Sequence, residues 1–114
     1  MVYKLRPAKE IQGDLDLIED FLVRTYQGFG DDLESAADRA FARIKGALDY
    51  MEGLAEQPHR GTEHPQVRSG LRTLTANRFI YYFEIDETSA EVRILAVFFG
   101  GVDHQAQILE RLRH

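Results

Sequence analysis

Three strand-like segments in succession, LRTLTANRFIYYFEIDETSAEVRILAVFF, constrain the fold of this chain more than any other feature. Residues 79–85 are almost all aromatic or β-branched, and residues 92–99 carry a single charge, a composition typical of buried strands. Residues 71–74 are predicted to form a shorter strand ahead of them. The connection over residues 86–91 is short and polar, so the two long strands are predicted to form a hairpin.

Both faces of the first long strand are apolar. Side chains alternate along a strand, so Phe79, Tyr81 and Phe83 point to one face, and Ile80 and Tyr82 point to the other. A sheet with one solvated face would alternate apolar with polar residues. We therefore expect helices on one face, and a loop, a partner or a ligand over part of the other.

Two amphipathic helices are predicted ahead of these strands. Pro7 suits the first turn of the first helix, which runs to about Tyr26. A Gly-Phe-Gly turn follows, and Asp31 with Glu34 resembles a capping box that opens the second helix. The stripes expected to be buried are Ile11, Leu15, Ile18, Leu22 and Tyr26 in the first helix, and Leu33, Ala37, Ala40, Phe41, Ile44, Leu48, Met51 and Ala55 in the second.

The two ends of the chain complete the expected fold. Residues 2–6 alternate and are predicted to form an edge strand, and residues 104–113 are predicted to form a short helix capped by Asp103. The order strand, helix, helix, three antiparallel strands and short helix predicts an α+β fold, with a helical hairpin packed on a small sheet. At 114 residues the chain suits one domain over residues 1–114.

The segment 57–70 contains prolines and glycines and is predicted to be a surface loop. His59 and His64 lie in it around Glu63, but this spacing matches no metal-binding motif. The chain has no cysteine, which excludes disulfides and thiolate sites. We expect neither a metal nor a cofactor.

The charge balance argues against general nucleic-acid binding. The net charge is −5, and the first 57 residues hold 7 Lys and Arg against 12 Asp and Glu. The second half is balanced, and all of its basic residues are arginines. An acidic surface repels the nucleic-acid backbone. The sequence shows no apolar run long enough for a membrane span and no signal peptide, so we expect a cytoplasmic protein.

Three segments, YKLRPAKEIQGDLDLI, GLRTLTANRFIYYFEID and VRILAVFFGGVDHQAQIL, resemble in order and spacing those of the RelE/ParE toxin superfamily. These proteins are the toxin halves of bacterial type II toxin-antitoxin modules and are also called plasmid stabilisation proteins. The resemblance covers essentially the whole chain. It implies the RelE/ParE-like fold and an antitoxin partner whose C-terminal segment wraps the toxin.

The RelE branch of the superfamily cuts mRNA on the ribosome with basic residues and a tyrosine. By resemblance, its arginine in the tyrosine-rich strand corresponds to Phe79 here, its strand-end histidine to Phe99, and its following basic residue to Val102. The nuclease constellation is therefore incomplete, and no catalytic residue is assigned. An arginine is always protonated near neutral pH and makes a poor general base. The arginines that could rebuild a cationic site are Arg60, Arg68, Arg72, Arg78 and Arg93.

The ParE branch is more similar, with the Gly100-Gly101 turn and Asp103 ahead of the last helix. ParE-like toxins bind DNA gyrase and stall it with its DNA cleaved. This resemblance implies a DNA gyrase inhibitor that acts by protein-protein binding and is neutralised by its cognate antitoxin. Two alternatives stay open: a RelE-like ribosome-dependent mRNA endonuclease, and a non-toxic member of the superfamily that only binds its antitoxin.

Recognition is expected on the exposed side of the sheet and its flanking loop. Strand arginines there could instead pair with Glu84, Glu87 or Glu91 across the hairpin. Tyr81 and Tyr82 are expected in the core or in a groove, and a solvent-exposed His104 is expected at the start of the last helix. The predicted partner-binding residues are Arg60, Arg68, Arg72, Arg78, Tyr82, Arg93, Phe99 and Asp103.

Overall fold

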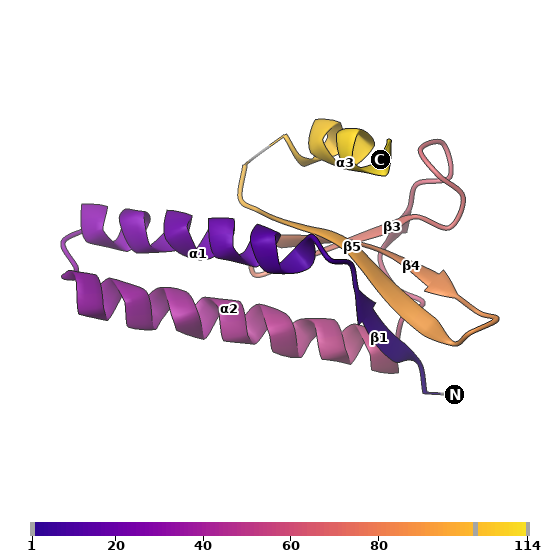
Figure 1. The fold of residues 1–114 in the computed structure, drawn as a ribbon, viewed down its shortest axis with the longest axis horizontal. Helices are drawn as coiled ribbons and strands as arrows, with labels where there is room; N and C mark the ends of the chain where they lie inside the picture. The colour runs from indigo at the N-terminus through magenta and orange to yellow at the C-terminus, as the bar shows by residue number, and fades with distance from the viewer. Residues whose placement is uncertain (1, 102, 114) are drawn as a thin grey trace.

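The structure, a computed structural model, describes residues 2–101 and 103–113. Over these residues the chain forms three helices and a five-stranded mixed sheet. The helices are α1 (Ile11–Gly28), α2 (Leu33–Glu56) and α3 (His104–Leu112), and the strands are β1 (Lys4–Pro7), β2 (Thr62–Glu63), β3 (Arg72–Ala76), β4 (Phe79–Asp86) and β5 (Glu91–Phe99). The antiparallel pair α1 and α2 lies on one side of the sheet, and α3 lies on the other (Figure 1). The predicted α+β arrangement is confirmed.

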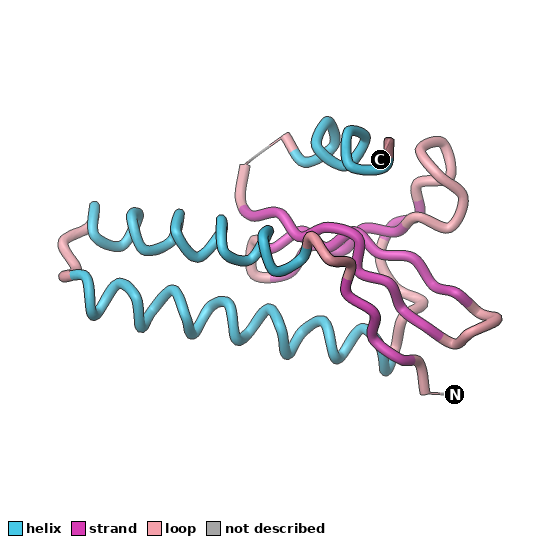
Figure 2. The backbone as a smooth tube through the Cα atoms, viewed as in Figure 1, coloured by secondary structure: helices cyan, strands magenta, loops and turns pink. Residues whose placement is uncertain are grey.

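The strand order is β1-β5-β4-β3-β2. β1 pairs in parallel with β5, and the other neighbours pair antiparallel. The predicted edge position of the N-terminal strand is confirmed. β2 was not predicted, because its two residues lie within the loop that the sequence indicated. The two long helices extend beyond the sheet (Figure 2), and the molecule measures 48 × 30 × 22 Å.

The alternation predicted for β4 is confirmed. Phe79, Tyr81 and Phe83 are buried against α1 and α2. Ile80 and Tyr82 belong to a second apolar cluster on the opposite face. The remaining buried members of that cluster are Leu71, Ala96, Phe98 and Ile108, with Val67, Leu95 and Leu112 packed against it. The second face is thus covered by α3 and by the loop before β3.

A β-bulge interrupts the pairing of β4 with β5. Tyr82 pairs with Ala96, but the next residue, Phe83, pairs with Ile94. Leu95 is therefore the extra residue, and the side chains of β5 change faces at this point. As a result, both Ile94 and Val97 belong to the cluster on the helical side.

The predicted start of the first helix is wrong by three residues, and the predicted cap of the second helix is wrong by one. Pro7 is the last residue of β1 rather than the first turn of a helix, and α1 begins at Ile11. The fixed φ of proline is compatible with the end of an edge strand as well as with a helix start. The N-cap of α2 is Asp32, whose carboxylate accepts a hydrogen bond from the Ser35 N–H at 2.8 Å, so the capping box of Asp31 and Glu34 does not form.

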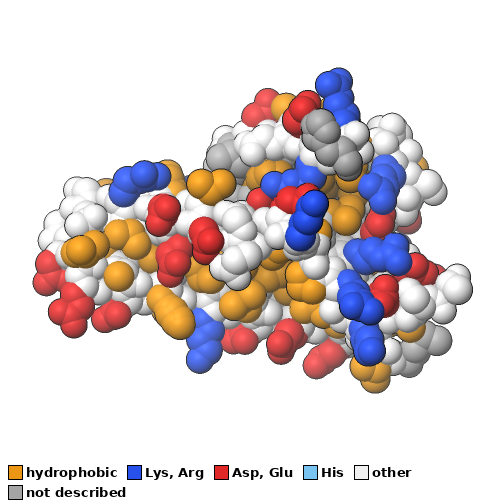
Figure 3. All heavy atoms as spheres, viewed as in Figure 1, with side chains coloured by type: hydrophobic (Ala, Val, Ile, Leu, Met, Phe, Trp, Pro, Cys, Tyr) orange, Lys and Arg blue, Asp and Glu red, His pale blue; other side chains and the backbone are white. Residues whose placement is uncertain are grey.

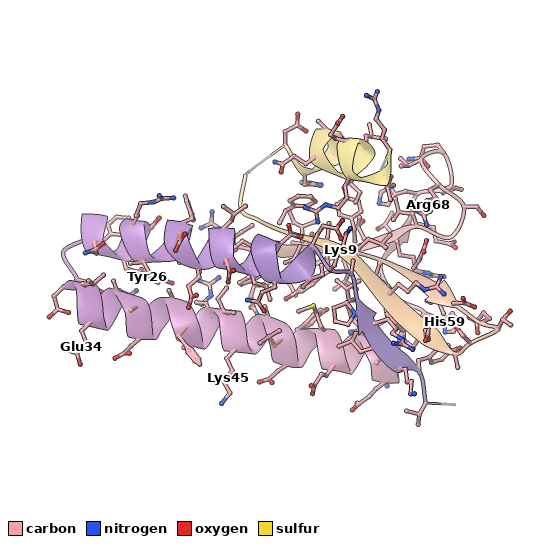
Figure 4. All side chains as sticks on the ribbon, viewed as in Figure 1. Lys9, Tyr26, Glu34, Lys45, His59 and Arg68 are labelled. Carbon is pink, nitrogen blue, oxygen red and sulfur yellow. The ribbon has the colours of Figure 1, made fainter. Side chains whose placement is uncertain are left out.

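The stripe predicted for α1 is confirmed, because Ile11, Leu15, Ile18 and Leu22 are buried and Tyr26 packs against them. Tyr26 is labelled in Figure 4 between the two long helices, and the Arg39 guanidinium lies 3.9 Å from the centre of its ring.

The stripe predicted for α2 is partly wrong. Leu33, Phe41 and Leu48 are 62%, 53% and 46% exposed. Ala40, Met51 and Ala55 are buried as predicted, and the rest of the buried face consists of Ala36, Ala47 and Leu54. Small side chains let α2 lie close to its neighbours, and the larger apolar residues are left at the edge of this face. None of the helices in the described ranges is long and apolar enough to cross a membrane.

Candidate partner-binding groove

A groove of about 450 Å³ opens between α1, α3 and the end of β5. Its wall is mostly apolar, and hydrophobic side chains are visible between α1 and α3 in Figure 3. The lining residues are Asp14, Leu17, Ile18, Phe21, Arg78, Val97, Phe98, Phe99, Gly100, Gly101, Gln107 and Arg111.

The α1 wall of this groove consists of Leu17 and Phe21, which lie one helical turn apart. They flank the buried positions Ile18 and Leu22, so they extend the apolar face of α1 past the core. Leu17 is 72% exposed and Phe21 is 50% exposed, and the Phe21 ring lies 6.1 Å from that of Phe99. A binding partner could therefore cover both side chains.

The polar floor of the groove is an ion pair between α1 and α3. Asp14 is 7% exposed, and Arg111 donates two hydrogen bonds to it: Nη1 to Oδ2 at 2.6 Å and Nη2 to Oδ1 at 2.7 Å. The Val97 N–H also donates to Oδ2, at 3.0 Å. The hydrogen bonds from Arg111 to the Asp14 carboxylate raise the pKa of Arg111 above its ordinary value. The pair holds α3 in place, and sequence reasoning missed it because the two residues are 97 positions apart.

Two arginines lie beside Phe99 at the end of the sheet. The Arg43 and Arg78 guanidinium groups lie 5.2 and 5.5 Å from the centre of its ring. Arg43 also donates to the Asn77 carbonyl at 2.8 Å, whereas Arg78 is exposed and lines the groove. Guanidinium groups bind carboxylates well, so a ligand with an acidic side chain is favoured here.

The predicted partner-binding residues do not form one surface. Arg68 and Arg93 lie on the α3 side of the sheet and share Glu84, at 3.1 and 3.9 Å. Arg93 also pairs with Asp86 at 2.7 Å and with Glu91 at 3.5 Å. For Arg93 the alternative of pairing with Glu84 across the hairpin is confirmed.

Arg60 and Arg72 lie on the helical side instead. Arg72 is opposite Phe83 in the strand register, and cross-strand partners share a face. It donates to the Arg60 carbonyl at 3.2 Å and pairs with Glu63 at 3.4 Å. The Arg60 guanidinium lies 5.5 Å from the Tyr50 ring, and its Nε is buried without a hydrogen-bond partner among the described residues.

Tyr82 lies under α3 rather than on an open sheet face. It is 3% exposed, and its hydroxyl lies 2.8 Å from Nδ1 of His104. His104 begins α3 as predicted, but it is partly rather than fully exposed. Burial raises the pKa of Tyr82. Tyr81 is 1% exposed, which confirms its core assignment, and Asp103 caps α3 by accepting from the Ala106 N–H at 3.2 Å.

Of the predicted set, Arg78 and Phe99 line the groove. Val102 lies outside the described residues. His59 and His64 have separate partners, Glu87 at 2.8 Å and Thr73 at 2.7 Å, and within residues 2–101 and 103–113 no group of three or more potential ligands could hold a metal ion. The groove residues Leu17 and Phe21 were not predicted as binding residues, although their spacing beside the buried stripe of α1 is visible in the sequence.

Comparison with known proteins identifies the fold. No protein-family model and no curated protein matches the sequence. A chain of the chromosomal ParDE toxin-antitoxin system from P. aeruginosa is similar, with a TM-score of 0.67 and 20% identity over 88% of this chain and 98% of that one.

Two further structures agree with this. The toxin-antitoxin complex RelBE2 from Mycobacterium tuberculosis has a TM-score of 0.60 and 12% identity, over 88% of this chain and all (100%) of that one. A variant of E. coli toxin RelE in the free state, with two arginines changed to alanine, has a TM-score of 0.61 and 8% identity, over 99% of this chain and 97% of that one. The chain therefore has the RelE/ParE toxin fold.

Proposed function

Because the chain has the RelE/ParE toxin fold, we propose that it is the toxin of a type II toxin-antitoxin, or plasmid stabilisation, system. It acts in the ParE manner, inhibiting DNA gyrase by protein-protein binding, and a cognate antitoxin neutralises it. Residues 1–114 form one toxin domain. The protein works in the cytoplasm, where gyrase is found.

The observation that carries the ParE assignment is the pair Phe79 and Phe99. By resemblance these positions carry an arginine and a histidine in the nuclease branch, but here they are 2% and 8% exposed. Their ring centres lie 4.9 Å apart, nearly perpendicular at 72°. An edge-to-face aromatic contact stabilises the core and offers neither charge nor a proton for phosphoryl chemistry.

The position of Tyr82 supports the same assignment. Its hydroxyl is covered by α3 and hydrogen-bonded to His104, and burial raises its pKa. A raised pKa makes the tyrosinate form, the form that could act as a base, scarcer near neutral pH. This favours inhibition by binding over cleavage of RNA.

The groove suits a segment of the antitoxin. Its apolar wall at Leu17 and Phe21 would bury alternate side chains of a segment that folds as it binds. A carboxylate on that segment would meet Arg78 at the rim, next to Phe99. The residues that contact the antitoxin are therefore proposed to be those of the groove, with Arg78 and Phe99 from the sequence-predicted set.

A gyrase cleavage assay tests this function. The purified protein is added to gyrase and supercoiled plasmid, and the reaction is stopped with detergent and protease. We expect linear plasmid to accumulate, because a stalled gyrase leaves its DNA cleaved. The product of the neighbouring reading frame, added first as the candidate antitoxin, should suppress the linear form.

A parallel reaction contains ribosomes and a reporter mRNA. Cleaved mRNA with intact plasmid would contradict the ParE assignment and establish the RelE-like alternative. If the plasmid and the mRNA both stay intact while the candidate antitoxin binds tightly, the protein is the non-toxic member of the superfamily.

A further inference from the structure

The helical hairpin carries an apolar strip along α2 that the described residues leave largely exposed, apart from Ile44, which packs against the core. Leu33, Phe41 and Leu48 are about half exposed or more, at 62%, 53% and 46%. With Ala37 and Ile44 between them they recur every three or four residues, so they form one stripe along α2. We call these five residues the outer strip.

The outer strip is separate from the groove. Leu48 lines a hollow formed with β1, with the segment before α1 and with the first turns of α1, including Leu5, Ala8 and Leu15. The groove is lined by the other side of α1, through Leu17 and Phe21, and shares no lining residue with that hollow. A protein bound at one site would leave the side chains of the other accessible.

Acidic side chains flank the outer strip. In Figure 3 they lie on both sides of the hydrophobic side chains over α1 and α2. The hairpin, residues 11–56, contains 11 Asp and Glu against 4 Lys and Arg. Two of the four basic residues already have partners, Arg39 with Asp31 and Arg43 with the Asn77 carbonyl. Glu34 and Lys45 project outward from α2 in Figure 4.

We propose that the outer strip is a second docking surface, for a basic amphipathic helix of another protein. The strip runs from Leu33 to Leu48, about 22 Å along α2 and matched by a partner helix of about 15 residues. Apolar side chains of that helix cover Phe41 and Leu48, and Lys or Arg on its flanks face the acids of α1 and α2.

The charge of the surface selects this occupant over the others. A second copy of this chain would place one acidic hairpin against another, and like charges in an interface are costly. A membrane surface is unsuitable for the same reason, because cellular membranes are anionic and attract basic helices. Towards Leu33 and Phe41 the hairpin extends beyond the sheet and is open to a partner helix (Figure 2), whereas Leu48, at the other end of the strip, lies beside β1.

The test uses two labelled designed helices with the same leucine face. One carries lysine at every flanking position and the other carries glutamate, and fluorescence anisotropy measures the binding of each to the full chain. We expect the lysine helix to bind at least about tenfold more tightly, with an affinity that falls as salt is added.

A matched pair of variants locates the binding. The double variant Phe41→Gln with Leu48→Gln should lower the affinity for the lysine helix by about tenfold, because both side chains would leave its apolar face. Leu109→Gln changes a leucine of similar exposure on α3, 52%, and should leave the affinity unchanged. Equal binding of the two designed helices, or equal effects of these variants, would overturn the proposal.

Two additional measurements test the role of charge and the possibility of self-association. Reversing the charge at Glu34 and Glu52 to lysine preserves the strip and should weaken the lysine helix while strengthening the glutamate helix. Sedimentation equilibrium checks self-association. A dimer that the double variant disrupts would assign the strip to a second copy and overturn the proposal. None of these readouts needs gyrase or an antitoxin, so their failure leaves the proposed function standing.

Discussion

Asp14 and Arg111 form a bidentate ion pair between the first and the last helix, although 97 positions separate them in the chain. The carboxylate is almost fully buried, and the guanidinium is about a quarter exposed. Arg111 also donates to the Leu95 carbonyl at 3.2 Å, at the β-bulge of β5. This single side chain thus joins α3 to α1 and to the sheet.

Replacing Arg111 with Met keeps the apolar stem and removes the partner of a buried charge. We expect the free energy of unfolding to fall by about 3 kcal/mol, because an unpaired buried carboxylate is strongly unfavourable. Urea denaturation followed by circular dichroism measures this loss.

The control for Arg111→Met is Arg113→Met in the same helix. Arg113 pairs with Glu110 at 3.5 Å, with both side chains largely exposed, so its loss should change stability by less than about 0.5 kcal/mol. A double-mutant cycle with Asp14→Asn separates the pair from other contacts of Arg111. Equal effects of the two methionine variants would show that the pair does not hold α3.

The turn between β3 and β4 gives a second prediction. Ala76 pairs with Phe79, so Asn77 and Arg78 form a two-residue loop, and both have positive φ, 52° and 71°. Asparagine tolerates this conformation and arginine does not favour it. Arg78→Gly should be more stable than Arg78→Ala by about 1 kcal/mol, because only glycine lacks the Cβ clash. Thermal unfolding compares the two.

These two variants also test the role of the guanidinium. Both remove it, so both should weaken antitoxin binding equally if Arg78 contributes through its charge. A loss confined to the alanine variant would instead assign the effect to the shape of the turn.

The sheet was predictable from sequence because its signals are local. The run from Phe79 to Phe83 is apolar at every position, which indicated correctly that both faces are covered. The change of face within β5 was not predictable, because the bulge at Leu95 depends on the register with β4. A continuous apolar run fits either register equally well.

The site was less predictable, because its contacts join distant parts of the chain. Sequence reasoning grouped the arginines of the strands by their composition, whereas the structure divides them between the two faces and pairs Arg93 with Asp86. The stripe of α2 was misplaced because Phe41 and Leu48 are larger than the alanines that make the true buried face. A hydrophobic pattern indicates a helix reliably. Which face of the helix is buried depends on how much space the neighbouring elements leave for its side chains.

The groove gives a third prediction, which rests on the proposed function. Phe21→Ser removes an aromatic side chain that is half exposed and contacts Phe99. We expect the affinity for the antitoxin to fall by about tenfold or more, because central aromatic residues dominate such interfaces. Isothermal titration calorimetry with the candidate antitoxin measures it. Phe29→Ser, at an 83% exposed position after α1, is the control and should bind normally.

The acid dependence of stability gives the last prediction, from carboxylates around the β4–β5 turn. A hydrogen bond from Arg6 lowers the pKa of Glu91, and the Ser89 N–H lowers that of Asp86. Because the pKa of Glu91 is lower in the folded state than its usual value of 4.5, this group stabilises the fold above that pH. Its contribution is lost as the pH falls through the lower folded pKa.

Glu91→Gln should therefore lower the melting temperature at pH 7. Between pH 5 and pH 3, a range taken roughly from these values, the melting temperature of this variant should decrease less than that of the unmodified protein. Glu56→Gln, at an exposed position at the end of α2, is the control and should follow the unmodified protein across the titration. If the Glu91→Gln curve runs parallel to that of the unmodified protein, the Arg6 pair does not contribute to the acid sensitivity.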